Sequence, residues 1–255
     1  WLFFRFASFN VQGFRHSDKQ RKVLHLARSH RVDVLVLQEC NFRTPTDVLS
    51  FRSRFNVEAF VLLTDSRCCG IGGIFLSPPY RAHCTYGIDG RVILVDLFLD
   101  GRKTRFVNVY APVTRSLTNE FFRSIMTYFL DDVPHFLLGD FNCVLHTMRD
   151  IREPGQGASN YHAKELGKLV RSLRLEDAWG TLQRDNFEAT RVWGQSASRI
   201  DRVYIPSAMA PDLLQCEVLP FPPGLKLSHH FPVTLRPVPC KQPPDVAHGC
   251  SGTTR

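Results

Sequence analysis

The sequence lacks the features that would mark a membrane-spanning or a secreted protein. No apolar run approaches the roughly 18 residues of a membrane-spanning helix. The opening Trp1-Leu2-Phe3-Phe4 is apolar, but Arg5 interrupts it, and no small-residue cleavage site ends an apolar run of signal-peptide length. We therefore expect an intracellular protein with no membrane partner.

The eight cysteines include no Cys-x-x-Cys pair, so the usual spacing of a zinc site is missing. Eight thiols in 255 residues are also too few for a disulfide scaffold. The segment Gly70-Ile-Gly-Gly73 lacks the Lys-Ser/Thr pair and the following helix of a phosphate-binding loop. No internal repeat of roughly 20 to 50 residues is visible. These absences argue against a zinc module, a disulfide-stapled domain, a phosphate-loop protein and a solenoid.

The composition is that of a globular protein with an excess of positive charge. Apolar residues make up 44% and charged residues 22%, which excludes a disordered or collagen-like chain. Lys and Arg number 32 against 24 Asp and Glu, giving a net charge of +8. By itself, this positive charge leaves open a nucleic acid, an anionic membrane surface or a phosphorylated substrate as the partner. The chain begins with Trp rather than Met, so we expect a fragment of a longer product.

Apolar periodicity predicts many short strands with helices between some of them. Strands are expected at 3–11, 32–39, 58–64, 72–76, 91–100, 105–110, 135–140, 198–205 and 230–235, and helices at 18–31, from Thr118 onward and at 162–175. Asp100-Gly101 is typical of a hairpin turn, and 151–160 reads as a loop. A two-layer sheet core with helices outside fits this pattern better than a doubly wound sheet. We expect one domain over residues 2–238 and a disordered tail or linker over 239–255.

Several predicted strands end in polar residues of the types that catalysis uses. They are Asn10, Gln38-Glu39, Asn108 with Tyr110, Asp140 with Asn142, Ser198-Arg199-Ile200-Asp201 and Ser228-His229-His230. Any one of these residues is more often a turn, cap or packing residue, so the interpretation depends on the ordered set. Strand ends converge at one rim of a sheet core, so these side chains are expected to share a pocket.

The ordered set resembles the exonuclease–endonuclease–phosphatase superfamily. The segments that carry the resemblance are FNVQG at 9–13, LVLQEC at 35–40, VNVYAP at 107–112, LLGDFNCV at 137–144, SRIDRVYI at 198–205 and LSHHFPVTL at 227–235. Together they cover residues 5–236 in the family order. Within the superfamily they look most like the endonuclease domain of LINE-type retrotransposons, which is itself similar to apurinic/apyrimidinic repair endonucleases.

The resemblance implies a four-layer α/β sandwich, with two packed, mostly antiparallel sheets flanked by helices. It also implies hydrolysis of a phosphodiester with Mg²⁺, for which Mn²⁺ is an alternative. Glu39 would be the main metal ligand, with Asn10 and His229 as further candidate ligands. Hard oxygen ligands suit Mg²⁺, which keeps several waters and needs only one or two carboxylates.

The resemblance assigns further roles residue by residue. Asp140 would orient and deprotonate the attacking water, and Asn142 would hold the phosphate or that water. Tyr110 would donate to a phosphate oxygen, and Asn10 would brace the site. His230, as an imidazolium, would stabilise the developing charge, while Asp201 would orient it and raise its pKa.

Two residues depart from the family pattern. Ser228-His229-His230 stands where the family usually has Ser-Asp-His, which removes a negative charge beside the metal. Because Mg²⁺ prefers oxygen to imidazole, its affinity should fall, and Mn²⁺ should be affected less. Gln12 stands where repair endonucleases often have an acidic residue. The fold assignment survives both departures, but the activity of this copy does not follow from the motifs.

Substrate contacts are expected from basic and aromatic residues outside the motifs. The basic set is Arg15, His16, Lys19, Arg21, Lys22, Arg28 and Arg31, which suits either a solvated helix face or contact with the DNA backbone. The loops 64–72 and 183–197 are candidates for reading groove shape, with Arg191 and Trp193 as wedge or minor-groove residues. Arg199 is a further candidate for substrate contact, although a structural role suits it better.

Three hypotheses for the function remain open. The first is a metal-dependent endonuclease domain that nicks DNA to prime target-site reverse transcription. A downstream reverse transcriptase in the same polyprotein and a nuclear location are then implied by the resemblance alone. The second is another phosphoesterase of this fold, such as an apurinic/apyrimidinic endonuclease, an inositol phosphatase or a sphingomyelinase-type enzyme. The third is a catalytically decayed transposon remnant.

Overall fold

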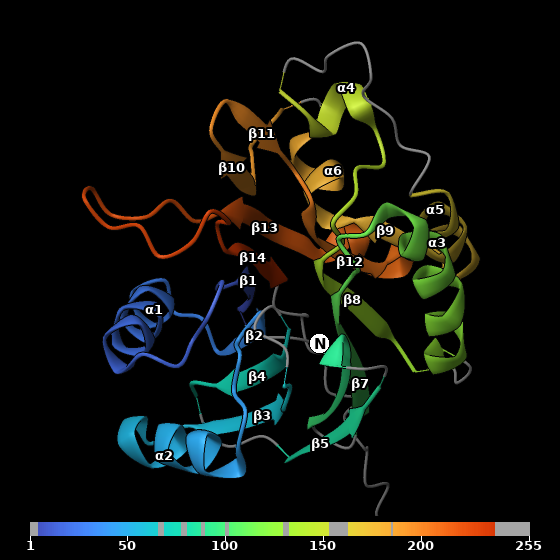
Figure 1. Cartoon of the computed structure of the whole chain (residues 1–255). Coiled ribbons are helices and arrows are strands. Elements are labelled where there is room, and N and C mark those ends of the chain that lie inside the picture. Colours follow the sequence, from blue (N-terminus) through green and yellow to red (C-terminus); the bar gives the residue numbers. More distant parts are fainter. Residues whose placement is uncertain are drawn as a thin grey trace, which may run out of the picture.

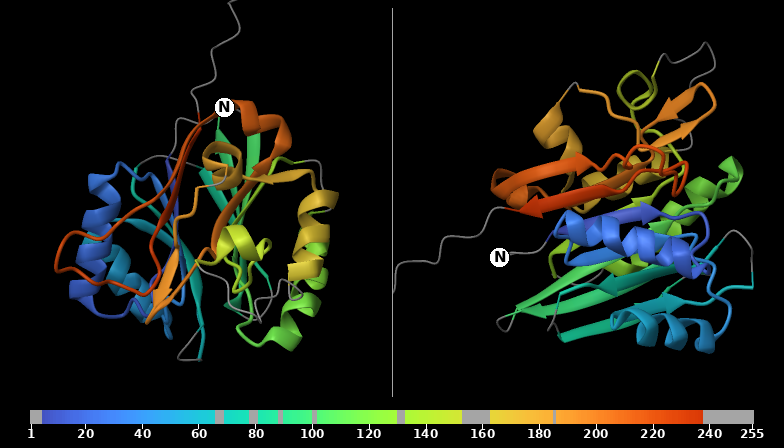
Figure 2. Two further views of the ribbon diagram at one scale, coloured as in Figure 1. Left: turned by 90° about the horizontal axis from the view of Figure 1, so that it is seen from above. Right: turned by 90° about the vertical axis from the view of Figure 1, so that its left-hand side faces the viewer.

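In a computed structural model of the chain, two six-stranded sheets pack face to face and helices cover their outer faces (Figure 1). The view from above in Figure 2 shows the four layers in order, helix, sheet, sheet and helix. The structure describes residues 5–65, 69–77, 81–87, 90–99, 102–129, 133–152, 163–184 and 186–237. The predicted four-layer sandwich is thus confirmed. The expected tail over 239–255 lies outside the described residues.

The first sheet contains both ends of the described chain. Its strand order is β13-β14-β1-β2-β4-β3. The strands are β1 (Phe6–Asn10), β2 (Val34–Gln38), β3 (Glu58–Leu62), β4 (Ile71–Phe75), β13 (Leu213–Val218) and β14 (Val233–Pro237). Only β1 and β2 pair in parallel; the other pairs of this sheet are antiparallel. Helices α1 (Ser17–Ser29) and α2 (Pro45–Phe55) cover its outer face.

The second sheet has the strand order β5-β6-β7-β8-β12-β9. Its strands are β5 (Arg81–Tyr86), β6 (Val92–Leu99), β7 (Arg102–Tyr110), β8 (His135–Asp140), β9 (Leu175–Asp177) and β12 (Asp201–Pro206). Again one pair, β7 with β8, is parallel. The helices α3 (Arg115–Ser124) and α5 (Lys164–Ser172) lie outside it.

Shorter elements lie between these strands and helices along the chain. They are the helices α4 (Thr147–Asp150) and α6 (Ala178–Gln183), the 3₁₀ turns at Ile125–Phe129 and Ser207–Asp212, and a hairpin of β10 (Arg191–Trp193) and β11 (Ser196–Ser198). In the described ranges, no helix combines the length and apolarity needed to cross a membrane.

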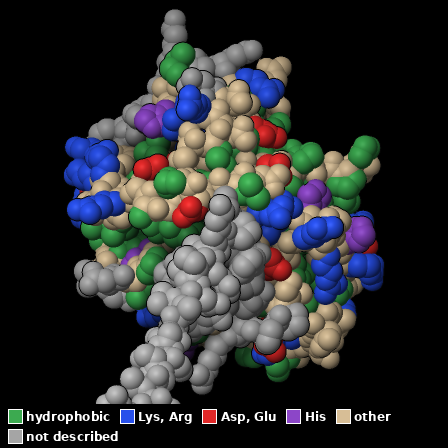
Figure 3. All heavy atoms as spheres, turned by 180° about the vertical axis from the view of Figure 1, so that it is seen from behind, with side chains coloured by type: hydrophobic (Ala, Val, Ile, Leu, Met, Phe, Trp, Pro, Cys, Tyr) green, Lys and Arg blue, Asp and Glu red, His purple; other side chains and the backbone are tan. Residues whose placement is uncertain are grey.

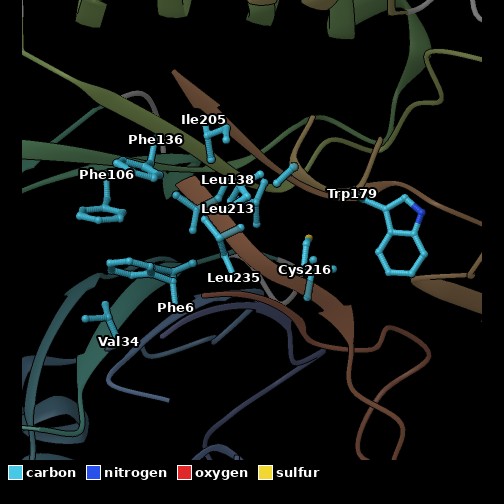
Figure 4. Packing of buried hydrophobic residues seen from close by; sticks show 14 of the residues in the cluster. Phe6, Val34, Phe106, Phe136, Leu138, Trp179, Ile205, Leu213, Cys216 and Leu235 are labelled. Carbon is cyan, nitrogen blue, oxygen red and sulfur yellow. The ribbon is translucent and has the colours of Figure 1, made fainter. Parts of the chain in front are cut away.

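Aliphatic and aromatic side chains fill the space between the two sheets (Figure 4). The rings of Phe106 and Phe136 stack with centroids 4.9 Å apart, and Phe6 from the other sheet lies 4.4 Å from Phe106. Replacing one such buried ring by Ala costs about 3–5 kcal/mol of folding stability. The core therefore fixes the two sheets, and with them their strand ends, relative to each other.

Several predicted boundaries differ from those of the structure. The helix expected from Thr118 begins at Arg115, and the strand expected over 198–205 is divided between β11 and β12. The strand expected from residue 230 begins at Val233, because His230 makes only an isolated bridge to Arg191. Helix α2 was not predicted, although Thr44 and Asp47 form a capping box with Pro45 at the first helical position.

Candidate active site

Four strand-end side chains, two from each sheet, meet in one hydrogen-bonded group. The Asn10 side-chain amide donates to Glu39 Oε1 at 2.9 Å and to Asp140 Oδ2 at 2.8 Å. The Tyr110 hydroxyl donates to the same Glu39 oxygen at 3.0 Å. These residues follow or end β1, β2, β7 and β8, the two parallel pairs, whose carboxyl ends lie at the same rim.

The backbone around Asp140 is shaped by a glycine that cannot be replaced without strain. Gly139 has φ +140°, and a Cβ there would lie 2.0 Å from the carbonyl oxygen of Val109 on the neighbouring strand. Beyond the strand, Asp140 Oδ1 accepts from the Asn142 backbone N–H at 2.9 Å. The Asn142 side chain in turn donates to the Ala111 carbonyl at 2.9 Å. This turn fixes Asp140 with one carboxylate oxygen directed to Asn142 and the other to Asn10.

A buried triad of Asp140, Asp201 and His230 lies next to this group. Asp201 is the register partner of Asp140 across β8 and β12. The Nδ1 atom of His230 lies 3.0 Å from Asp201 Oδ2 and 3.9 Å from Asp140 Oδ2. All three side chains are buried, so their charges interact strongly.

Burial and neighbouring charges shift the pKa values of His230 and Asp140. Burial lowers the pKa of the His230 imidazole, but the Asp201 carboxylate, supported by Asp140, outweighs it and raises that pKa to about 9. The pKa of Asp140 is raised to about 7, mainly by burial and then by the negative charge of Asp201. The charge of His230 and the hydrogen bond from Asn10 lower this pKa, but by less. At neutral pH the arrangement therefore favours the imidazolium form of His230.

Two residues that support the triad were not predicted as site residues. The buried Thr190 hydroxyl accepts from the backbone N–H groups of Ile200 and Asp201, both at 3.0 Å. Its carbonyl accepts from the Phe231 N–H at 2.7 Å. Thr190 belongs to none of the motifs, and its sequence context carries no signal for this role.

Gln12, noted only as a departure from the family, is the second of these residues. Its Oε1 atom accepts from the Ser228 hydroxyl at 3.0 Å and from the His229 N–H at 2.8 Å. Its backbone N–H donates to Asn10 Oδ1 at 3.1 Å. The Lys19 ammonium stabilises this turn by donating to the Val11 and Gln12 carbonyls at 2.5 and 3.2 Å. Gln12 thus connects Asn10 to the turn that carries His230.

Arg199 belongs to a buried ion network rather than to the open rim. It is 2% exposed and donates to Asp150 Oδ1 at 2.7 Å and to Asp177 Oδ2 at 2.6 Å. Arg202 donates to the other Asp150 oxygen at 2.8 Å. Both guanidinium groups hold the pKa of Asp150 well below its ordinary value, against the effect of burial, which raises it. This burial and pairing suit a structural role for Arg199.

His229 does not join the carboxylates. Its ring centroid lies 4.3 Å from that of Trp193, in an edge-to-face arrangement. Trp193 itself is 56% exposed on the β10–β11 hairpin, and Arg191 of the same hairpin is half-buried beside His230. The structure thus brings Arg191, Trp193 and His229 together on one side of the triad.

The donor set at Glu39 fits a divalent ion with oxygen ligands. The Glu39 carboxylate is a hard-oxygen donor of the type that Mg²⁺ and Mn²⁺ accept. Asn10, a further candidate ligand, turns its amide nitrogen to Glu39, and its Oδ1 accepts from the Gln12 N–H. Within the described residues, three side chains of types that bind metal ions lie close together, namely Asp140, Asp201 and His230. Because His230 tends to hold a proton there, the Glu39 end suits the ion better.

Basic side chains gather on two flanks of the molecule, over α1 and over α5 (Figure 3). On or beside α1, the exposed ones are Arg15, His16, Arg21, Lys22, His25, Arg28 and Arg31, and on α5 they are Lys164, Lys168 and Arg171. Lys19 is half-buried against the turn described above. These flanks provide positive charge for a polyanion without any sequence preference.

The fold and the site at the strand ends together define a class of α/β sandwich proteins that hydrolyse phosphoesters. The profile of the Endonuclease/Exonuclease/phosphatase family matches residues 7–221, and the chain belongs to this family. This match confirms the family that the motifs indicated.

Proteins similar to this chain include a transposon protein and two endonucleases of known structure. The "Transposon TX1 uncharacterized 149 kDa protein" of Xenopus laevis is 29% identical over 210 residues, which are 79% of this chain and 16% of that protein. An AP endonuclease from Archaeoglobus fulgidus superposes with a TM-score of 0.76 at 15% identity, over 92% of this chain and 99% of the other. The endonuclease domain of TRAS1, a telomere-specific non-LTR retrotransposon, superposes with a TM-score of 0.68 at 13% identity, covering 92% and 98%. These structures share the fold of the chain.

Proposed function

We propose that the chain is a metal-dependent endonuclease domain that nicks DNA to prime target-site reverse transcription by a retrotransposon. The observation that carries this proposal is the Asn10 amide, which links Glu39 to the Asp140–Asp201–His230 triad. The similarity to a transposon protein supports the biological setting. The proposal includes a reverse transcriptase downstream in the same polyprotein and action in the nucleus, where the target DNA lies.

Glu39 would hold Mg²⁺ or Mn²⁺. The bound ion supplies charge stabilisation to the phosphoryl oxygens during hydrolysis. Tyr110 fixes the Glu39 carboxylate through its hydroxyl, so the ligand oxygen is oriented before substrate binds. Asn10 donates to the same Glu39 oxygen.

The remaining polar residues act on water and phosphate. Asp140, fixed by Asn10 and Asn142, accepts a proton from the attacking water. Asn142 holds that water or a phosphate oxygen. His230 stabilises the charge that develops on phosphorus-bound oxygen, and Asp201 keeps its ring oriented and protonated.

DNA is the proposed substrate because exposed cations lie on α1, the helix that follows the strand ending in Asn10. The exposed cations of α1 would contact the phosphate backbone and supply affinity that falls with salt. Arg191 and Trp193 on the hairpin would contact the groove near the cut. A small inositol phosphate would need no such extended surface.

Nicking of supercoiled plasmid with Mg²⁺ and then with Mn²⁺ tests the proposal. The protein is compared with Glu39→Ala, with His229→Asp and with Glu120→Ala, an exposed acidic residue on α3 that serves as control. We expect the protein and the control to nick and Glu39→Ala to fail, with EDTA abolishing all nicking. Nicking by His229→Asp alone would identify this copy as decayed. If every folded variant is inactive on DNA, the nuclease assignment is wrong, and phosphatase substrates should be tested.

A further inference from the structure

We infer that His229 is a positioning residue for Trp193 and not a ligand of the divalent ion, and that their rings form an aromatic ledge against which a base of the bound DNA stacks. The inference rests on the proposed function and concerns how that site holds its substrate. We use the term aromatic ledge for Trp193 and His229 together.

The backbone of His229 is held on both sides, which fixes the direction of its side chain. Its N–H donates to Gln12 Oε1 at 2.8 Å, and its carbonyl accepts from the Val192 N–H at 2.8 Å. The ring then meets the Trp193 indole edge to face, with centroids 4.3 Å apart. Edge-to-face packing is a favoured aromatic geometry, so the imidazole supports the indole.

The surroundings of His229 offer little to a divalent cation. The Gln12 side chain, which accepts from the His229 N–H, is neutral, and its carbonyl oxygen is already engaged by Ser228 and His229. Among the described residues, the clustered metal-ligating side chains do not include His229. An imidazole is also a poor ligand for Mg²⁺. The substitution of Asp by His therefore removes a charge from the metal side and adds a ring on the hairpin side.

The ledge is joined directly to the catalytic turn. Arg191 forms a β-bridge with His230, and Phe231 N–H donates to the Thr190 carbonyl at 2.7 Å. The first strand of the hairpin is thus bonded along the segment that carries His230. Trp193, at 56% exposed, is the largest side chain on that strand and faces solvent.

An exposed indole that is held rigidly beside a phosphate-cleaving group is suited to stacking on a base. Stacking on aromatic side chains is tolerant of sequence, because every base has a π-face. The rigid support of His229 reduces the freedom that the indole loses on binding. The ledge would thereby set the distance between a stacked base and the phosphate next to His230.

Four variants separate the two roles of His229. His229→Phe keeps a ring but has no ligand atom, His229→Asp has a ligand oxygen but no ring, His229→Ala has neither, and Trp193→Ala removes the supported indole. Leu214→Ala, at an exposed position on β13, is the control. Affinity for a labelled DNA duplex is measured by fluorescence anisotropy in EDTA, so that no cleavage or metal contributes.

We expect His229→Ala, His229→Asp and Trp193→Ala each to weaken DNA binding by about three- to tenfold, and His229→Phe to recover most of the affinity. In the Trp193→Ala background, His229→Ala should add less than a twofold further loss, because the two rings act together. The indole emission, taken as the difference from Trp193→Phe, should shift to longer wavelength in His229→Ala as the ring gains contact with water.

The inference is overturned if His229→Phe binds as weakly as His229→Ala, or if the losses from His229 and Trp193 are additive. It is also overturned if His229→Phe raises the metal concentration for half-maximal nicking more than tenfold while DNA affinity is unchanged. A protein that binds DNA through the ledge but never nicks would refute the proposed hydrolysis and keep the ledge. A protein that nicks DNA, and whose DNA affinity is unchanged in every ledge variant, would refute the ledge and keep the proposed hydrolysis.

Discussion

Asn10 and Asp140 lie 130 positions apart in the chain, yet the Asn10 amide donates to the Asp140 carboxylate at 2.8 Å and to Glu39 at 2.9 Å. One neutral donor thus separates two carboxylates from different sheets. Asn10→Ala should leave these carboxylates without their common donor and lower kcat for nicking by about 10- to 100-fold.

Plasmid nicking at saturating metal tests the role of Asn10, with circular dichroism to verify the fold. Asn119→Ala is the matched control, because Asn119 accepts from Glu165 N–H between α3 and α5, away from the strand ends. Activity of Asn10→Ala within twofold of the unaltered protein would show that the shared donor is dispensable.

The rate of nicking should follow a bell-shaped pH profile. Asp140 must be ionised to accept a proton, and because its pKa is raised to about 7, activity should increase as pH rises through that value. His230 must be protonated, and because its pKa is raised to about 9, activity should fall as pH rises further. The dependence of kcat/KM on pH measures both limbs.

Asp201→Asn provides the internal check of this profile. Loss of the Asp201 carboxylate lowers the pKa of His230, because the imidazolium loses its partner, and lowers the pKa of Asp140, because a like charge disappears. Both limbs should therefore move to lower pH. A profile whose limbs stay in place would separate the triad from the rate-determining protonation states.

Gly139→Ala should prevent stable folding. The new Cβ would lie 2.0 Å from the Val109 carbonyl oxygen at a φ of +140°, and a backbone clash of this kind costs more than about 4 kcal/mol. Gly194→Ala is the control: its φ is +57°, but no atom lies within 4 Å of the added Cβ. That change should cost about 1–2 kcal/mol. Thermal unfolding of the two variants decides the matter, and equal melting temperatures would contradict the steric argument.

Asp150→Ala should destabilise the protein strongly. Its carboxylate is fully buried and pairs with Arg199 and Arg202 at 2.7 and 2.8 Å. Removing it leaves two buried guanidinium groups without their shared partner, at a cost of about 3–5 kcal/mol. Urea unfolding gives the free energy, with the exposed Asp212→Ala as control. A loss below about 1 kcal/mol would mean that water or Asp177 replaces the missing carboxylate.

The strands that bear motifs were predictable because they are short, apolar and buried. β2 and β8 are buried along their whole length, and continuous apolar runs predict such strands. The polar residues at the ends of these strands then predicted a shared pocket at one rim of the sheet core. The two-sheet architecture followed from the family resemblance and from the excess of strands over helices.

Other parts were beyond sequence patterns, because they depend on contacts between distant residues. The contact of Gln12 with His229 spans 217 positions, and neither residue type predicts it. Likewise, the Arg199-x-Asp201 pattern does not predict that Arg199 pairs with Asp150, which lies 49 positions away in the sequence. Thr190 is a residue whose role arises only from the fold. The capping box at Thr44, in contrast, was a readable signal for α2.

The place of β14 in the first sheet has a consequence for synthesis on the ribosome. This strand, the last within the described residues, pairs with both β13 and β1, and His230 precedes it by three residues. A nascent chain that ends before residue 213 therefore leaves β1 with an open edge, which is a site for wrong pairing. The same unfinished chain has no His230 to complete the triad. Cutting of DNA, if the proposed chemistry holds, is thereby delayed until the whole domain has been translated.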